Sequence, residues 1–292
     1  QKMKKRSDKY RIKEMVDVSV GLDTLKEMMR HYDAVLICDV KTEMRNKILK
    51  YCFEKSIRTY ITPKISDIIV RSADDIHLFD TPLLLCRNCG LNFEQRVIKR
   101  LMDIVISLVI LTITSPIMLV TAIAIKAYDH GPAFFKQKRC TINGKVFEIL
   151  KFRSMIVDAE KPGMVIPAKD RDPRITPVGR FIRATRIDEL PQLINVLKGE
   201  MSIVGPRPER VEHVEKYSRD IPEFSYRLKV KGGLTGYAQV LGKYNTTAYD
   251  KLKLDLMYIE NYSIALDLKL LLMTIKIVFS KESTEGFEEE NN

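Results

Sequence analysis

An uncharged stretch of 22 residues, from Ile104 to Ile125, restricts most strongly what this chain can fold into. At 1.5 Å of rise per residue, a helix of that length extends about 33 Å, which is enough to cross the hydrocarbon core of a bilayer. The stretch therefore predicts a membrane helix, although a buried helix of a soluble core has a similar composition.

Ser115 and Pro116 lie in the middle of this stretch, where proline removes a backbone hydrogen bond and its ring crowds the preceding turn. Basic residues lie at both ends, Lys99 before the stretch and Lys126 after it. The positive-inside rule therefore does not predict which end faces the cytoplasm. We expect a re-entrant helical hairpin over residues 101–127, broken at Ser115 and Pro116, that enters and leaves by one membrane face. A spanning helix with a tolerated proline is the alternative.

A second membrane-related pattern lies near the end of the chain. Between Ser263 and Phe279, the charged residues Asp267, Lys269 and Lys276 are interspersed with leucine and isoleucine. This pattern is typical of an amphipathic helix at the membrane interface, although a core helix would have almost the same pattern.

The first part of the chain has a different periodicity. Helix-like segments at 22–32 and 41–56 alternate with strand-like segments at 34–38 and 58–62. This order predicts a partial nucleotide-fold-like α/β domain over residues 1–90. No glycine-rich phosphate loop follows the first strand, so the pattern favours a structural or regulatory role over dinucleotide binding.

The net charge of +11 indicates an anionic partner, which leaves nucleic acid, phospholipid headgroups and phosphorylated substrates open. No helix-turn-helix, zinc-finger or aromatic RNA-binding signature accompanies the charge, so nucleic acid is not the expected partner. The five cysteines follow no disulfide spacing, which fits a reducing cytoplasm, and the lone CxxC of Cys86 and Cys89 lacks the two further ligands of a zinc site. The acidic segment 282–292 predicts a disordered tail.

Two adjacent carboxylates, Asp188 and Glu189, stand at the expected start of a helix, with Pro191 in its first turn and Gly199 as its stop. An N-cap with no catalytic role is the simpler interpretation. We expect nearby cations and the helix N-terminus to keep both carboxylates ionised. An ionised Asp188 can attack phosphorus, and Glu189 can hold Mg²⁺.

Basic residues surround this pair in a pattern that suits a phosphorylated ligand. They are Lys151, Arg153, Arg183, Arg186 and Arg207. Arg207 lies between two prolines, which form a rigid mount for a guanidinium that grips phosphate, with an ordinary surface turn as the alternative.

Seven short motifs follow one another along the chain. They are Lys99-Arg100-Leu-Met-Asp103, Ser115-Pro116, Gly131-Pro132 with Gln137 and Arg139, Lys151-Phe-Arg-Ser-Met155, Asp188-Glu189-Leu-Pro-Gln192, Gly205-Pro-Arg-Pro208 and Leu234-Thr-Gly-Tyr-Ala-Gln239. Together they resemble the monotopic phosphoglycosyl transferases, the bacterial sugar transferase family, over roughly residues 94–281. The chain departs from that family's pattern at Lys231-Gly232-Gly233 and at Tyr237, where the family usually has Arg-Pro-Gly and Trp.

The resemblance implies a membrane-associated α/β transferase that requires Mg²⁺, with a catalytic pair of Asp188 and Glu189. Asp188 would attack the β-phosphate of a UDP-sugar and release UMP, and undecaprenyl phosphate would then take the sugar phosphate from the covalent intermediate. Glu189 is also the expected metal ligand. The expected substrate-binding residues are Lys151, Arg153, Arg183, Arg207, Gln137, Arg139 and Asp255.

The resemblance further implies the cytoplasmic face of a bacterial inner membrane, contact with anionic lipids, and the first step of exopolysaccharide, capsule or glycoconjugate synthesis. Larger family members carry transmembrane helices and a nucleotide-fold-like domain before the transferase, so we expect this chain to be a fragment of such a protein. The sugar and the oligomeric state, including a homo-oligomer, remain open. Two other functions also remain: a glycosyltransferase that releases a nucleoside diphosphate, and a membrane-anchored nucleic-acid-binding or scaffold protein.

Overall fold

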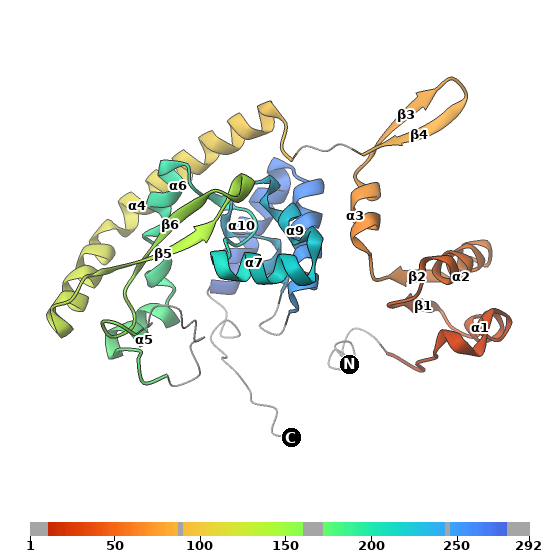
Figure 1. Cartoon of the computed structure of the whole chain (residues 1–292), viewed down its shortest axis with the longest axis horizontal. Coiled ribbons are helices and arrows are strands. Elements are labelled where there is room, and N and C mark those ends of the chain that lie inside the picture. Colours follow the sequence, from red (N-terminus) through yellow and green to blue (C-terminus); the bar gives the residue numbers. More distant parts are fainter. Residues whose placement is uncertain (1–10, 87–89, 160–171, 243–245, 279–292) are drawn as a thin grey trace. The chain divides into compact units, whose positions relative to one another are not determined.

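A computed structural model describes residues 11–86, 90–159, 172–242 and 246–278 (Figure 1). Tertiary contacts divide the chain into two units, Gln1–Lys64 and Ile65–Asn292. The division falls before residue 65, and not near residue 90, because Ile65 and Ile68 pack in the hydrophobic core of the second unit.

Over residues 11–64, the part of the first unit that the structure describes, there are one 3-10 helix, two α-helices and two strands. They are η2 (Val18–Val20), α1 (Leu22–Met29), β1 (Ala34–Ile37), α2 (Thr42–Glu54) and β2 (Arg58–Ile61). β1 and β2 pair in parallel, with Ala34 opposite Arg58, so α2 is the crossover helix between them. Apolar side chains of α1 and α2, including Leu25 and Ile48, form the small core. The predicted βαβ order is confirmed.

The second unit contains more helix than strand. Its α-helices are α3 (Ile65–Arg71), α4 (Phe93–Asp129), α5 (Pro177–Ala184), α6 (Gln192–Lys198), α7 (Val211–Asp220), α8 (Tyr237–Leu241), α9 (Ala248–Glu260) and α10 (Ile264–Val278). Its 3-10 helices are η3 (Ile142–Gly144), η4 (Ile187–Glu189) and η5 (Pro222–Lys229). Its strands are β3 (Asp74–Leu78), β4 (Thr81–Leu85), β5 (Phe134–Cys140), β6 (Val146–Phe152), β7 (Ser202–Val204) and β8 (Gly233–Thr235).

These strands form three two-stranded sheets within the described residues, antiparallel for β3 with β4 and for β5 with β6, and parallel for β7 with β8. Figure 1 shows β5 and β6 beside α6. Asn195 of α6 explains this contact: its Oδ1 accepts from the Leu150 N–H at 2.9 Å, and its Nδ2 donates to the Glu148 carbonyl at 2.8 Å. The side chain thus continues the hydrogen bonding of β6 onto α6, and brings the residues just before α6 close to β6.

The long apolar stretch forms a single helix, α4, with Pro116 inside it. The helix is long and apolar enough to cross a membrane, and only 11% of its most apolar 18-residue window is buried within the chain. The expected break into two helices is absent between residues 93 and 129. Ser115 Oγ donates to the Thr112 carbonyl at 2.9 Å, and this carbonyl is the one left without a partner by the missing N–H of Pro116. The helix also extends beyond the expected 101–127 at both ends.

The two basic residues before the apolar stretch point into the second unit. Lys99 is 8% exposed and its Nζ lies 2.6 Å from Asp267 Oδ2, while Arg100 donates to the carbonyls of Val196 and Leu197 at 2.6 Å. Lys99 is therefore not the headgroup-facing flank that the charge pattern had indicated, because a buried carboxylate neutralises it.

The helix expected between Ser263 and Phe279 is confirmed as α10, and Phe279 itself lies outside the described residues. The helix buries Leu270 and exposes Lys269 and Lys276, as an amphipathic helix does, but it also buries a charge and exposes apolar side chains. Asp267 is 2% exposed, whereas Leu268, Leu272 and Ile275 are exposed. Cys89 and the acidic segment 282–292 also lie outside the described residues.

Candidate active site

The two predicted catalytic carboxylates lie in the 3-10 turn η4, immediately before α6. Arg186 precedes this turn with φ of 60°, a left-handed conformation that redirects the chain after α5. The sequence had indicated that Asp188 caps α6, but it does not. Leu190 and Pro191 already have helical backbone angles, and Pro191 takes the cap position. The predicted stop at Gly199 is confirmed.

Glu189 binds two of the predicted cations. Its Oε1 lies 3.2 Å from Lys151 Nζ and 2.7 Å from Arg207 Nη2. Lys151 comes from β6 and Arg207 from the loop after β7, so three separate segments meet at this carboxylate. Burial opposes ionisation of Glu189, but Arg207 and Lys151 outweigh it and hold the pKa of Glu189 far below its ordinary value.

The environment of Asp188 differs from that of its neighbour. Burial and the negative charge of Glu189 raise the pKa of Asp188, against the opposing charges of Lys151, Arg183 and Arg186. The cations therefore outweigh burial at Glu189 but not at Asp188, and the ionised state expected for Asp188 stays a prediction. A carboxylate whose anion is less stabilised is the more basic of the two, and the better candidate for a nucleophile.

Three other predicted substrate-binding residues have partners within the protein. Arg153 is buried and forms an ion pair with Asp129 at the end of α4, so it does not join the cluster around Glu189. Arg139 donates to Gln137 Oε1 at 2.6 Å and to the Pro208 carbonyl at 3.1 Å. Gln137 and Arg139 therefore support the loop that carries Arg207.

Asp255 is 1% exposed, and its contact with a substrate stays a prediction. Its Oδ2 lies 2.8 Å from Arg227 Nη2, and the same nitrogen donates to the Arg207 carbonyl at 2.9 Å. Arg227 Nη1 also lies 3.5 Å from Glu209 Oε1. Burial raises the pKa of Asp255 to about 6, against the opposing charge of Arg227. Arg227 was not identified from the sequence, where no motif surrounds it in η5.

A metal cage built from protein side chains alone is not present in the described residues, where no three His, Cys, Asp or Glu residues cluster closely enough to hold an ion. Mg²⁺ commonly uses only one or two carboxylates when substrate phosphates complete its coordination. Asp188 and Glu189 supply that number, so the pair fits a Mg²⁺ ion that is shared with a phosphorylated substrate.

Comparison with known proteins places these residues in a family. The sequence model of the bacterial sugar transferases matches residues 94–281. The UDP-glucose:undecaprenyl-phosphate glucose-1-phosphate transferase of Klebsiella pneumoniae is 38% identical over 87% of this chain and 54% of its own length. The protein of the same name from Escherichia coli K12 is 43% identical over 68% of this chain and 42% of its own length.

A relative named for a different sugar is equally similar. The UDP-N-acetylgalactosamine-undecaprenyl-phosphate N-acetylgalactosaminephosphotransferase of Aeromonas hydrophila is 44% identical over 63% of this chain and 44% of its own length. The chain thus spans about half the length of these three relatives. Because the family model covers most of the chain, including η4 and the loop of Arg207, the chain belongs to the bacterial sugar transferase family.

Proposed function

We propose that this chain transfers a sugar 1-phosphate from a UDP-sugar to undecaprenyl phosphate, through a covalent phospho-sugar on Asp188, and that it releases UMP. The observation that carries this proposal is the asymmetry of the carboxylate pair. Glu189 is held by Lys151 and Arg207, while the pKa of the adjacent Asp188 is raised. One carboxylate therefore fixes the phosphate-binding cations and the other is the nucleophile. The donor and acceptor classes follow the names of the relatives.

The reaction has two displacements at phosphorus. A carboxylate oxygen of Asp188 attacks the β-phosphorus of the donor, and the bond from that phosphorus to the bridging oxygen breaks. UMP leaves with the bridging oxygen and its electron pair. A phosphate oxygen of undecaprenyl phosphate then attacks the same phosphorus, and the bond to Asp188 breaks, which restores the carboxylate and leaves a lipid diphosphate sugar.

The cations around the pair bind and orient the phosphates in both steps. The Arg207 guanidinium can donate two parallel hydrogen bonds to a phosphate, and Lys151 supplies a point charge beside it. The positive charge of Arg183 opposes the overall rise in the pKa of Asp188, so Arg183 is a third cation near the nucleophile. A Mg²⁺ ion bound by Glu189 together with the donor phosphates would neutralise part of the phosphate charge.

We infer that α4 enters the bacterial inner membrane from its cytoplasmic face, with α10 at the interface beside anionic lipids. Support comes from the exposed apolar surface of α4, the exposed leucines of α10 and the cationic composition of the chain. A lipid diphosphate sugar can be extended by further sugars, so we place the reaction at the start of exopolysaccharide, capsule or glycoconjugate synthesis.

The test is intact-protein mass spectrometry with UDP-glucose or UDP-N-acetylgalactosamine and Mg²⁺ but without lipid acceptor. The wild-type chain should gain the mass of a phospho-sugar that maps to Asp188, and the released nucleotide should be UMP. Asp188→Asn removes the negative charge with little change of shape, so the adduct and the release of UMP should both disappear.

The matched control is Asp220→Asn, which changes an exposed aspartate at the end of α7 and should leave adduct formation unchanged. Release of UDP would identify a glycosyltransferase that moves only the sugar, and an active Asp188→Asn variant would exclude the covalent mechanism.

A further inference from the structure

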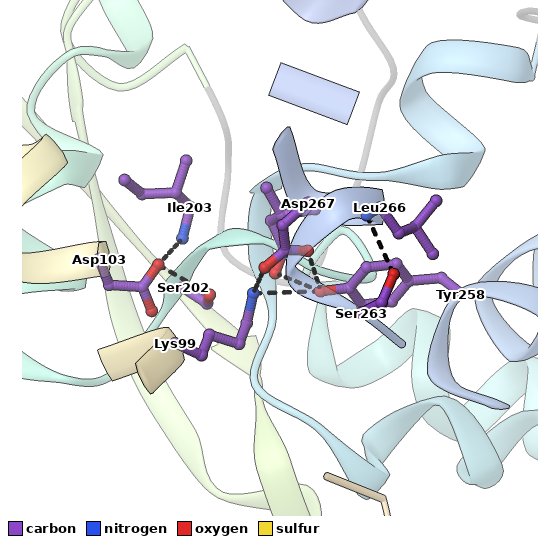
Figure 2. Close-up of polar contacts among 9 residues, drawn as sticks. Lys99, Asp103, Ser202, Ile203, Tyr258, Ser263, Leu266 and Asp267 are labelled. Atoms are coloured by element: carbon purple, nitrogen blue, oxygen red, sulfur yellow. Dashed lines mark hydrogen bonds and ion pairs between the residues drawn. The ribbon is translucent and has the colours of Figure 1, made fainter. Parts of the chain in front are cut away.

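A buried group of polar residues joins α4 to α10 (Figure 2). Lys99 Nζ lies 2.6 Å from Asp267 Oδ2 and donates to the Tyr258 hydroxyl at 3.1 Å, and that hydroxyl also lies 2.8 Å from Asp267 Oδ1. The Lys99 ammonium is also within 6 Å of the centres of the Tyr258 and Tyr262 rings, at 5.8 and 5.4 Å. We call Lys99, Asp267 and Tyr258 the junction triad.

Within the junction triad, Asp267 is unusual for its place on α10. Asp267 is the only acidic residue of that helix and is almost completely buried, while Leu268, Leu272 and Ile275 are exposed. Rotation or detachment of α10 would leave a buried charge without its partner, which is strongly unfavourable. The ion pair therefore helps to fix which face of α10 is exposed, and that face carries these three apolar residues together with Lys269 and Lys276.

The same ion pair ties α10 to the membrane helix. Lys99 lies on α4 just before Leu101, Val105 and Leu108, which are exposed apolar residues. Two helices with exposed apolar faces are thus held together by a charged contact that both of them bury. A bilayer is the partner that fits both faces, because α4 is long and apolar enough to enter one.

Lys99 and Asp267 are separate from the residues that hold the candidate active site, whereas the Tyr258 hydroxyl also donates to the Val204 carbonyl of β7 at 3.2 Å. The loop of Arg207 is supported by Arg227 with Asp255, and α6 is held to β6 by Asn195. None of these contacts involves Lys99 or Asp267. Loss of the ion pair should therefore leave the donor site in place and loosen α10, which is still held by buried Leu270 and by the 2.7 Å contact between the Thr274 and Thr235 hydroxyls.

We propose that Asp267 is a positioning residue for the lipid acceptor. Through Lys99 it holds the apolar face of α10 at the bilayer surface in fixed relation to α4, so that a polyprenyl phosphate in the membrane reaches Asp188. The proposal rests on the proposed function for its acceptor, but its effect on α10 is measured without any reaction.

The chain contains no tryptophan, so single tryptophans report position directly. Leu272→Trp on α10 and Val105→Trp on α4 each change an exposed residue. In vesicles of phosphatidylcholine and phosphatidylglycerol with brominated acyl chains, both reporters should be quenched. With Asp267→Asn, quenching at position 272 should fall by at least half, while quenching at position 105 persists.

Activity gives a second readout. Asp267→Asn should raise KM for undecaprenyl phosphate roughly ten-fold, as expected when a reacting group is misplaced by a small distance, while acceptor-free UMP release stays at the wild-type rate. Glu43→Gln is the matched control, because it breaks an exposed ion pair with Lys47 in the first unit and should change neither readout.

The double variant Lys99→Met/Asp267→Leu separates positioning from folding, since apolar replacement of a buried ion pair often preserves stability. We expect it to fold and release UMP, yet to keep the raised acceptor KM and the weak quenching at position 272. Wild-type acceptor KM in this variant would show that the pair serves folding alone, and unchanged quenching in Asp267→Asn would also overturn the proposal. Failure of the wild-type chain to form the adduct would instead count against the proposed function.

Discussion

Arg207 and Glu189 lie 18 residues apart in the sequence, and Arg207 Nη2 is 2.7 Å from Glu189 Oε1. Lys151 reaches the same oxygen atom from β6. One carboxylate oxygen of Glu189 thus holds both cations. The positions of Lys151 and Arg207 therefore depend on the negative charge of Glu189, and that of Arg207 depends also on its loop.

Arg207→Lys keeps the charge but removes the planar fork of donors. We expect kcat/KM for the UDP-sugar to fall about ten- to one-hundred-fold, which corresponds to the loss of one bidentate phosphate contact. Release of UMP without acceptor measures the change. Arg180→Lys, at an exposed position of α5, is the control and should behave as wild type.

Glu189→Gln removes the charge that Lys151 and Arg207 share. We expect slower formation of the phospho-sugar adduct and a higher Mg²⁺ concentration for half-maximal rate, because a metal ligand is lost while Asp188 remains. Titration of Mg²⁺ in the acceptor-free assay measures both effects. An unchanged Mg²⁺ requirement would exclude Glu189 as the ligand. The control is Glu212→Gln, at an exposed position of α7, which should have the Mg²⁺ requirement of the wild type.

Asp255 predicts a pH dependence. Burial raises its pKa to about 6, so the folded protein keeps this carboxyl protonated below that pH, where an ordinary aspartate is already ionised. Protonation removes the charge that faces Arg227 and loosens the support of the Arg207 loop. We expect donor kcat/KM to fall as the pH drops below about 6, and Asp255→Asn to lower kcat/KM above pH 6 and to lose this step in the profile. A profile shared by wild type and variant would contradict this role.

The membrane topology of α4 can be tested by cysteine labelling. Glu94→Cys and Tyr128→Cys place thiols near the two ends of the helix, in a chain whose own cysteines are replaced by alanine. A re-entrant helix predicts that an impermeant reagent labels both sites from the cytoplasmic side only. Labelling of the two sites from opposite sides would establish a spanning helix.

Gly179 predicts a test of packing. A Cβ atom at this position would lie 1.8 Å from the backbone oxygen of Ser154, which a side-chain rotation cannot relieve. Gly179→Ala should therefore destabilise the second unit by more than about 1 kcal/mol, the typical cost of overpacking. Thermal unfolding followed by circular dichroism measures the loss, and Arg180→Ala next to it should have little effect.

Elements with a local signal were predictable from the sequence. The βαβ order of the first unit follows from alternating apolar segments, and the uncharged stretch from Ile104 identifies the long helix. Gly199 was recognised as a helix stop because glycine accepts the left-handed conformation that it adopts, with φ of 85°. Glu189 and its cations Lys151 and Arg207 were also identified correctly as neighbours, whereas Arg153 pairs with Asp129.

The features that were not predicted are of two kinds. Some are contacts between residues that are distant in sequence, and one is a single hydrogen bond inside a helix. Asp255 and Arg227 are 28 residues apart and meet only in the folded core, so the sequence holds no local signal for their ion pair. Lys99 resembled a membrane flank because its partner lies 168 residues away. Within the unbroken α4, the Ser115 hydroxyl donates to the Thr112 carbonyl that Pro116 leaves without a donor, and the sequence does not specify the direction of that hydroxyl.

Arg100 and Asp103 lie near the start of α4, yet they bind the interior of the second unit. Arg100 donates to two carbonyls at the end of α6, and Asp103 accepts from the Ser202 hydroxyl and the Ile203 N–H. The membrane helix is thus part of the enzyme's frame as well as its attachment. Truncation before Phe134 should yield a domain with broken internal supports, so a detergent-free version of this protein must retain α4 and replace its exposed apolar side chains.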